Sequence, residues 1–172
     1  MTMVMRNDPI LDRRSIRRYT TQDVEEKDVR MLLEAGMAAP SAGNERPWHF
    51  VVVRDRRLMQ SIIEVHPYAQ MLKQSPVAVL ICGDSTLEKY PGFWVQDCSA
   101  AVENMLIMAV KLNLGAVWLG IYPIEERVRG LRQLLRLPEN VIPFALVSIG
   151  HPDEEKRPLD RYDEERVHRD GW

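Results

Sequence analysis

Residues 76 to 83 read Pro76-Val77-Ala78-Val79-Leu80-Ile81-Cys82-Gly83, an apolar run without a charged side chain. A strand covered on one face alternates apolar and polar residues, whereas a strand buried on both faces is apolar throughout. The run is therefore typical of a strand at the centre of a sheet. Other stretches rich in β-branched or aromatic side chains predict further strands, and these are residues 48–53, 115–122 and 144–150.

Helical patterns lie around these strands. A helix is predicted after the polar segment 20–28, because the apolar residues that follow recur at a spacing of three and four and continue almost to Pro40. Asp8-Pro9 resembles a helix cap followed by a first-turn proline and predicts a short helix. Further helices are predicted at residues 55–64, 68–73 and 125–137.

The segment 94–112 differs from these helices because it is apolar on all sides and carries few charges. A helix with an apolar surface all round is too hydrophobic to lie on the outside of a monomer. We expect it to be buried in the core or at a subunit interface.

Composition excludes several classes of protein. The chain has 172 residues, 45% of them hydrophobic, so we expect one domain over residues 1–172. A net charge of −2 does not provide the basic surface that nucleic-acid binding requires. The N-terminus carries no apolar run of signal-peptide length and no segment reaches the length of a membrane span, so we expect a cytoplasmic location and no membrane partner. Cys82 and Cys98 are expected to be buried thiols, and the histidines lack the spacing of a metal site.

The segment Arg13-Arg14-Ser15-Ile16-Arg17-Arg18-Tyr19 concentrates four guanidinium groups and a hydroxyl in seven residues. Guanidinium groups bind phosphate oxygens in pairs and stay charged at any working pH. One interpretation is a site for a single anionic group. The other is a solvated basic turn whose arginines pair with Asp8, Asp12 or Asp23, and the segment alone favours neither.

The common nucleotide and nucleophile motifs are missing from the sequence. No GxGxxG follows a predicted strand, and neither GxxxxGK[ST] nor GxSxG occurs. A loop of small and turn-forming residues, 41–47, leads into the strand at Trp48, which is a common position for a site. Trp118-Leu119-Gly120 ends the strand that starts at Gly115, and Gly120 would let the backbone approach a flat ligand there, although these residues alone favour a plain strand end.

Taken together, these segments resemble the FMN-dependent nitroreductase family. Residues 13–17 resemble its N-terminal phosphate and ribityl motif. Ala39-Pro40-Ser41-Ala42-Gly43-Asn44-Glu45-Arg46-Pro47-Trp48-His49-Phe50 resembles its APSxxNxQPWxF loop, although Arg46 replaces the usual Gln. Gln96-Asp97, the segment 115–120 and Ile149-Gly150-His151-Pro152 follow in the family's order.

The resemblance implies an α+β fold with a mixed central β-sheet flanked by helices. It also implies an intertwined homodimer in which a C-terminal extension, about 152–172, crosses onto the partner subunit. FMN is then expected at the subunit interface, with NADH or NADPH as the reductant.

The resemblance further implies the residues that bind the cofactor. Arg13, Arg14, Ser15 and Arg17 are expected to contact FMN from one subunit, and Pro40, Ser41, Ala42 and Asn44 from the other. Trp118, Leu119 and Gly120 are expected to place a backbone N–H beside flavin N5. Arg161 of the tail is expected to complete the phosphate site, and Gln70 replaces a lysine that some members place near the flavin pyrimidine.

The activity implied is the transfer of hydride from NAD(P)H to a nitroaromatic, a quinone or a similar conjugated small-molecule acceptor, in ping-pong order. No side chain is expected to act as a catalyst, since the flavin performs the chemistry. Two alternatives remain. One is a flavin-binding or sensing module with little turnover, and the other is a related flavoenzyme that reduces enones, dehalogenates or fragments flavin.

Overall fold

A computed structural model of the chain describes residues 8–157 and 159–172. The helices are α1 (Pro9–Asp12), α2 (Glu26–Met37), α3 (Arg56–Val65), α4 (Trp94–Lys111) and α5 (Glu125–Leu135), with 3-10 turns η1 (Ala42–Asn44), η2 (Gln70–Lys73) and η3 (Glu164–Arg166). The strands are β1 (Trp48–Val53), β2 (Val77–Asp84), β3 (Gly115–Gly120) and β4 (Val141–Gly150).

The four strands form one sheet in the order β1-β2-β4-β3, in which every neighbouring pair is antiparallel. β2 lies inside the sheet and is buried along its whole length, as its apolar run predicts. The parallel pairing of the expected mixed sheet is limited, among the described residues, to a single bridge between Ser15 and Ala116. The α+β class is confirmed.

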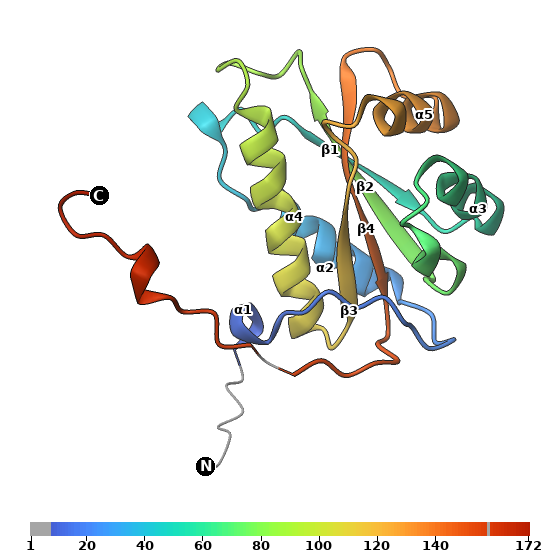
Figure 1. The fold of residues 1–172 in the computed structure, drawn as a ribbon. Coiled ribbons are helices and arrows are strands. Elements are labelled where there is room, and N and C mark those ends of the chain that lie inside the picture. The colour runs from blue at the N-terminus through green and yellow to red at the C-terminus, as the bar shows by residue number, and fades with distance from the viewer. Residues whose placement is uncertain (1–7, 158) are drawn as a thin grey trace.

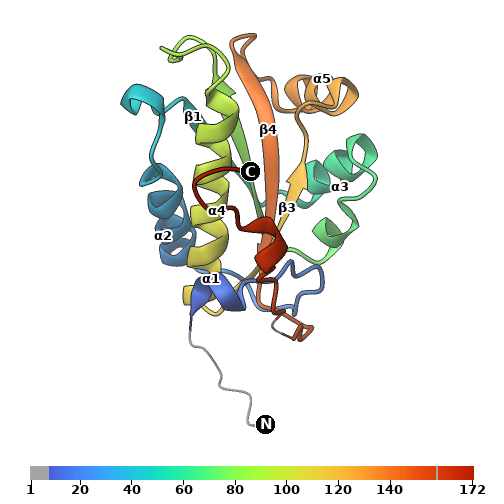
Figure 2. The ribbon, with the colours of Figure 1, turned by 60° about the vertical axis from the view of Figure 1, so that its left-hand side comes forward.

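Two helical layers cover the two faces of the sheet (Figure 1). α2 and α4 pack on one face, where Leu32 and Met105 join a core cluster with β2 and β4. α3 and α5 pack on the other, where Ile62 and Leu131 join a second cluster. Figure 2 shows α4 crossing the front of the sheet, and its half-buried residues include Val95, Ala100, Ile107 and Met108.

The segment that follows α1 is hydrogen-bonded to the edge strand β3. Asp8 caps α1 by accepting hydrogen bonds from the N–H groups of Ile10 and Leu11 at 2.9 and 3.3 Å. The Ile16 N–H then donates to the Ala116 carbonyl at 3.0 Å. At Gly115 a Cβ atom would lie 2.6 Å from the Ile16 side chain, so this close approach requires glycine.

The C-terminal residues divide into two parts. Residues 152–157 lie against the N-terminal segment of their own chain, where the Asp153 N–H donates to the Arg18 carbonyl at 2.9 Å. Residues 159–172 run away from the body and end at a fully exposed Trp172, which stacks on His168 (Figure 1). The expected crossing of this extension onto a partner remains a prediction.

Candidate functional site

The outer edge of β3 organises the site. Ile121 donates its N–H to the Phe144 carbonyl at 3.2 Å, and in an antiparallel pair the residues that bond to the partner strand alternate with residues that do not. The backbone groups of Leu119 therefore point toward β4. Those of Ala116, Trp118 and Gly120 point outward, and the Ala116 carbonyl accepts the Ile16 N–H. Of the predicted segment 118–120, only Trp118 and Gly120 can offer backbone N–H groups to a ligand.

The arginine segment lies at the beginning of this edge. Arg13 forms an ion pair with Glu103 of α4, with Nε 3.2 Å from Oε1. Arg14 donates to backbone carbonyls, including that of Arg157 at 3.0 Å and that of Leu11 at 2.8 Å. Its Nη2 is buried without a hydrogen-bond partner in the described chain. An unpartnered guanidinium N–H beside other cations suits an anionic ligand.

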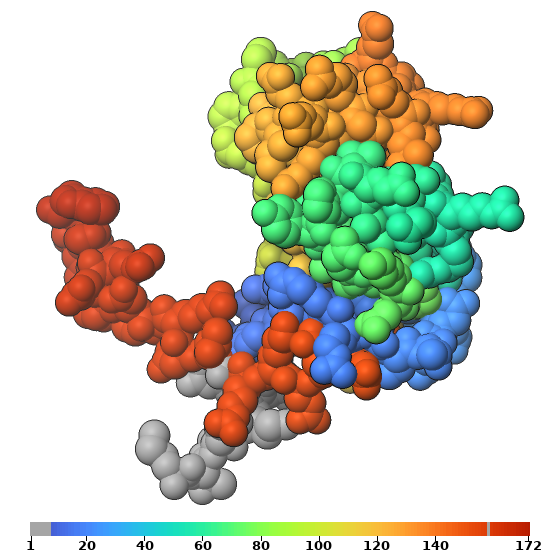
Figure 3. Space-filling model, turned by 45° about the vertical axis from the view of Figure 1, so that its right-hand side comes forward, coloured from blue at the N-terminus to red at the C-terminus, as the bar shows by residue number. Residues whose placement is uncertain are grey.

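Ser15 and Arg17 are tied to residues 154–156 through their backbone. The Ser15 carbonyl accepts a hydrogen bond from Lys156 Nζ at 2.6 Å, and the Arg17 N–H donates to Glu154 Oε1 at 2.6 Å. The hydrogen bond from Arg17 lowers the pKa of the Glu154 carboxyl. The guanidinium group of Arg17 is exposed. Figure 3 shows the residues that follow β4, coloured orange-red, against the N-terminal segment, coloured blue.

Lys156 is a cation that the sequence motifs do not indicate, and it lies beside Ser15 although 141 residues separate the two. The predicted Arg161 is exposed in the segment that leaves the body. Its role at the phosphate remains a prediction.

The far end of the edge is Gly120. Four residue rises of about 3.3 Å separate it from Ala116, so the two ends lie about 13 Å apart along the strand. A Cβ atom built on Gly120 would meet nothing within 4 Å, which leaves open space beside its backbone. Its carbonyl accepts hydrogen bonds from His66 at 3.0 Å and from Arg127 at 2.8 Å. Gln70, four residues after His66, is exposed and donates to the Pro67 carbonyl at 3.0 Å.

The loop of Pro40, Ser41, Ala42 and Asn44 is built separately, next to the first turn of α4. The Ala42 N–H donates to Asp97 Oδ1 at 3.0 Å. Gly43, Asn44 and Arg46 all have positive φ angles, of 51°, 55° and 48°. Such backbone conformations persist only where surrounding contacts hold them.

Two buried carboxyl groups hold this loop. Glu45 Oε2 accepts the N–H groups of Lys89 and Tyr90 at 2.7 and 3.2 Å. Its Oε1 and Asp97 Oδ2 are both buried without another partner in the described chain. Burial raises the pKa of Asp97, and the adjacent Glu45 carboxyl raises it further. Burial also acts to raise the pKa of Glu45, but the hydrogen bonds from Lys89 and Tyr90 outweigh it, and the net pKa is lowered. The pKa values of the two neighbouring carboxyl groups are therefore shifted in opposite directions.

The structure does not bring the two halves of the predicted site together within one chain. Asp97 of α4 bonds to the loop, and Glu103 of the same helix pairs with Arg13. These two anchoring residues are six positions apart, which is about 9 Å along the helix axis. Figures 1 and 2 show α4 between the loop and β3.

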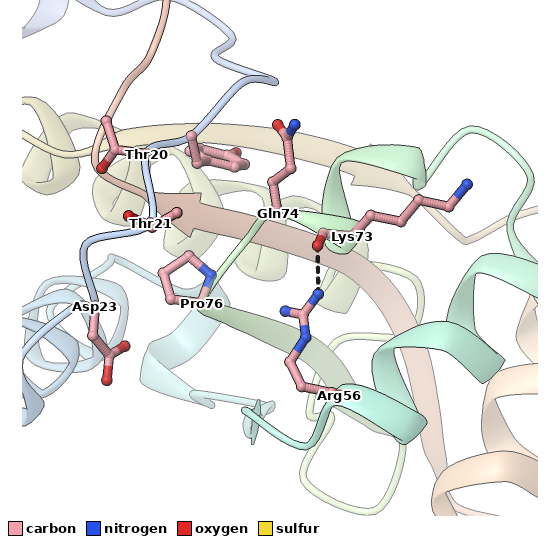
Figure 4. Close-up of a pocket in the computed structure, with 8 residues that line it drawn as sticks. Thr20, Thr21, Asp23, Arg56, Lys73, Gln74 and Pro76 are labelled. Atoms are coloured by element: carbon pink, nitrogen blue, oxygen red, sulfur yellow. Dashed lines mark hydrogen bonds between the residues drawn. The ribbon is translucent and has the colours of Figure 1, made fainter.

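Two hollows of the surface lie away from this edge. One of about 500 Å³ is bordered by Thr20, Thr21, Asp23, Lys73 and Gln74, and Figure 4 shows Arg56 beneath it, bonded to the Lys73 carbonyl. Another of about 300 Å³ lies between Tyr122 and α5. No predicted site residue lines either hollow, so the candidate site is the open edge of β3.

Metal ligation and membrane insertion find no support in the described residues. No three His, Cys, Asp or Glu side chains come together there as metal ligands. None of the helices in this part of the chain combines the length and the hydropathy needed to cross a membrane.

The chain is similar to known proteins in sequence and in fold. The sequence model of the Nitroreductase family matches residues 10–66 and 62–151. A Methanothermobacter thermautotrophicus protein, named as a candidate NADH dehydrogenase/NAD(P)H nitroreductase, is 52% identical over 95% of this chain and 85% of its own length.

Two solved structures extend the comparison. That of a candidate NADH oxidase from Clostridium acetobutylicum is 43% identical, with a TM-score of 0.93 over 96% of this chain and 100% of that one. That of a candidate nitroreductase from Desulfovibrio desulfuricans, in complex with FMN, is 32% identical, with a TM-score of 0.83 over 95% of each chain.

Proposed function

The chain belongs to the nitroreductase family, and from this premise we propose that it passes hydride from NAD(P)H through FMN to a nitroaromatic, a quinone or a similar conjugated acceptor. It is an oxidoreductase whose cofactor is FMN and whose reductant is NAD(P)H. The finer parts of the proposal are the class of acceptor and a ping-pong order in which both substrates use one open flavin face in turn.

The observation that carries the proposal is the layout of the β3 edge. Cationic side chains lie at its beginning, around Ser15, and unpaired backbone N–H groups point outward at Trp118 and Gly120, about 13 Å further along the strand. A phosphate ester at one end of a ligand and a hydrogen-bond-accepting ring at the other match this order. The buried Arg14 Nη2 without a partner and the open space at Gly120 both fit such a ligand.

Each group has a separate task in the proposed site. Arg13, Arg14 and Lys156 would hold the phosphate, with Ser15 as a hydroxyl donor. Arg17, whose guanidinium is exposed, would lie near the flavin pyrimidine, where a fixed cation favours the negative charge of the reduced ring. The Gly120 N–H would face N5. FMN supplies the hydride acceptor and donor, while the protein supplies binding, orientation and charge.

A homodimer would complete this site. The half-buried apolar residues of α4 offer a surface for a second copy, and the loop of Pro40, Ser41, Ala42 and Asn44 would meet the β3 edge of the partner. The extended segment after residue 158 would lie across that partner, with Arg161 at its phosphate. The cytoplasmic location remains a prediction from the sequence.

An anaerobic titration tests the function. Purified protein loaded with FMN should be yellow. NADH or NADPH should bleach the flavin at least as fast as the enzyme turns over in the steady state. Initial rates at several acceptor concentrations should give parallel double-reciprocal lines. Protein that rejects FMN contradicts the proposal, and intersecting lines contradict the ping-pong order. Yellow protein that neither nicotinamide bleaches would indicate a binding module.

A further inference from the structure

Two side chains from different elements converge on one carbonyl at the end of β3. His66, which follows α3, places Nε2 3.0 Å from the Gly120 oxygen. Arg127 of α5 donates to the same oxygen from Nη1 at 2.8 Å. The Arg127 guanidinium also lies over the Tyr68 ring, 5.5 Å from its centroid. The peptide group that follows Gly120 is therefore held from the α3 side and from the α5 side.

The protonation of His66 follows from its surroundings. The imidazole is only 2% exposed, and a carbonyl is an acceptor, so Nε2 must carry the proton. Nδ1 is buried without a partner in the described chain, as suits an unprotonated nitrogen. Burial lowers the pKa of His66, and the neighbouring charge of Arg127 lowers it further. His66 is therefore neutral, and Arg127 carries the only charge of this pair.

These contacts change what the edge of β3 offers to a ligand. An outward-facing strand residue normally presents both an N–H and a C=O group. At Gly120 both lone pairs of the carbonyl are taken by His66 and Arg127. The N–H of Gly120 then remains as the group that can bond to a ligand. The permanent positive charge of Arg127 lies next to the carbonyl of the same residue.

We propose that His66 and Arg127 are positioning residues, which hold the Gly120 carbonyl and place the Arg127 charge at the end of β3, where it favours the reduced form of the bound flavin. The proposal rests on the proposed function. A fixed positive charge stabilises the reduced, negatively charged ring more than the neutral oxidised ring.

The main test compares FMN-loaded variants poised at one fixed potential. Arg127→Met keeps an unbranched apolar stem but removes the charge and the donor. It should lower the ratio of reduced to oxidised flavin about tenfold, equal to about 30 mV for a two-electron couple. Arg127→Lys should recover most of the ratio. Arg129→Met, an exposed arginine two positions along α5, is the matched control and should leave the ratio unchanged.

A second measurement needs no cofactor. In FMN-free protein, the ¹³C chemical shift of the Gly120 carbonyl should move in Arg127→Met and in His66→Leu but not in Arg129→Met, because only the first two remove a hydrogen bond to that oxygen. Thermal unfolding of each variant confirms that it is folded, and Arg127→Met tests the proposal even where His66→Leu fails to fold.

The outcomes separate the two levels of inference. Wild-type protein that rejects FMN overturns the proposed function. The ¹³C shift of the Gly120 carbonyl then still tests the hydrogen bonds from His66 and Arg127. A wild-type protein that binds and reduces FMN, with an unchanged flavin ratio in Arg127→Met, overturns the positioning role while the function stands. An equal fall in Arg129→Met would reduce the effect to general surface charge, and it too overturns the proposal.

Discussion

The β3 edge and the loop 40–46 are two halves of one predicted site, but they are held in different ways. The edge is fixed by backbone hydrogen bonds of the sheet and by donors that do not titrate in the ordinary range, such as Arg127. The loop has three residues with positive φ angles and is fixed by the carboxyl groups of Asp97 and Glu45, whose pKa values are shifted in opposite directions. We therefore expect the edge to keep its contacts above the ordinary imidazole pKa, where His66 is neutral, and the loop to respond to pH in the carboxyl range.

The largest expected effect is on the loop. Asp97→Ala removes the acceptor of the Ala42 N–H and opens a space beside the buried Glu45 carboxyl. An unsatisfied buried group of this kind costs about 3 kcal/mol of unfolding free energy, measured by urea denaturation. Gln96→Ala, an exposed neighbour in the same turn, is the control and should cost under about 0.5 kcal/mol. Equal losses in the two variants would mean that Asp97 does not support the loop.

Substitution of an exposed arginine at the edge should lower the affinity for FMN without lowering the stability of the fold. The Arg17 guanidinium is exposed, so Arg17→Ala should leave the unfolding temperature unchanged while it weakens FMN binding by about 2 kcal/mol, the usual value of a charge-assisted contact. Arg18→Ala is the matched control, because Arg18 is also exposed and lies 3.7 Å from Asp153. Fluorescence titration of FMN measures both. If Arg18→Ala weakens binding as much, the Arg17 contact is not specific.

Much of the fold follows from the sequence because apolar runs and their spacing are local signals. β2, α2 and α4 lie where their patterns predict. β4 begins at Val141 rather than at Phe144, because a proline such as Pro143 interrupts the pattern by which a strand is predicted. The structure accommodates Pro143 opposite Cys82, at a register shift between Ile81 and Cys82.

The partners that hold the site could not be predicted in the same way. His66 and Gly120 are 54 residues apart, and Lys156 and Ser15 are 141 apart. Neither His66 nor Lys156 belongs to a local motif. His66 and Lys156 reach the edge of β3 only because α3, α5 and residues 152–157 pack around that strand. The motif residues themselves can be predicted because each group of them is contiguous.

A smaller effect tests the pH response of the loop. Because the pKa of Asp97 is raised, its contribution to stability is complete below the ordinary carboxyl pKa and is lost as the pH rises through the folded-state pKa. Asp97→Asn keeps an acceptor for the Ala42 N–H and a donor toward Glu45 but cannot titrate. Its unfolding free energy should fall less than that of wild type as the pH rises above the ordinary carboxyl range, because only the wild type has to ionise a carboxyl group whose pKa is raised in the folded state. Parallel pH profiles of the two proteins would contradict a raised pKa at Asp97.

The smallest expected change in stability is at the end of the edge. Gly120 has no positive φ, and a Cβ atom there meets nothing within 4 Å. Gly120→Ala should therefore alter the unfolding free energy by less than about 0.5 kcal/mol. The same change at Gly115, where the added Cβ would clash with Ile16 at 2.6 Å, should be strongly destabilising. Yet the methyl group added by Gly120→Ala enters the space proposed for the flavin ring, so FMN affinity should fall in this variant although the fold is intact. A Gly120→Ala variant that is stable and binds FMN with unchanged affinity would show that the ring does not lie against this end of β3.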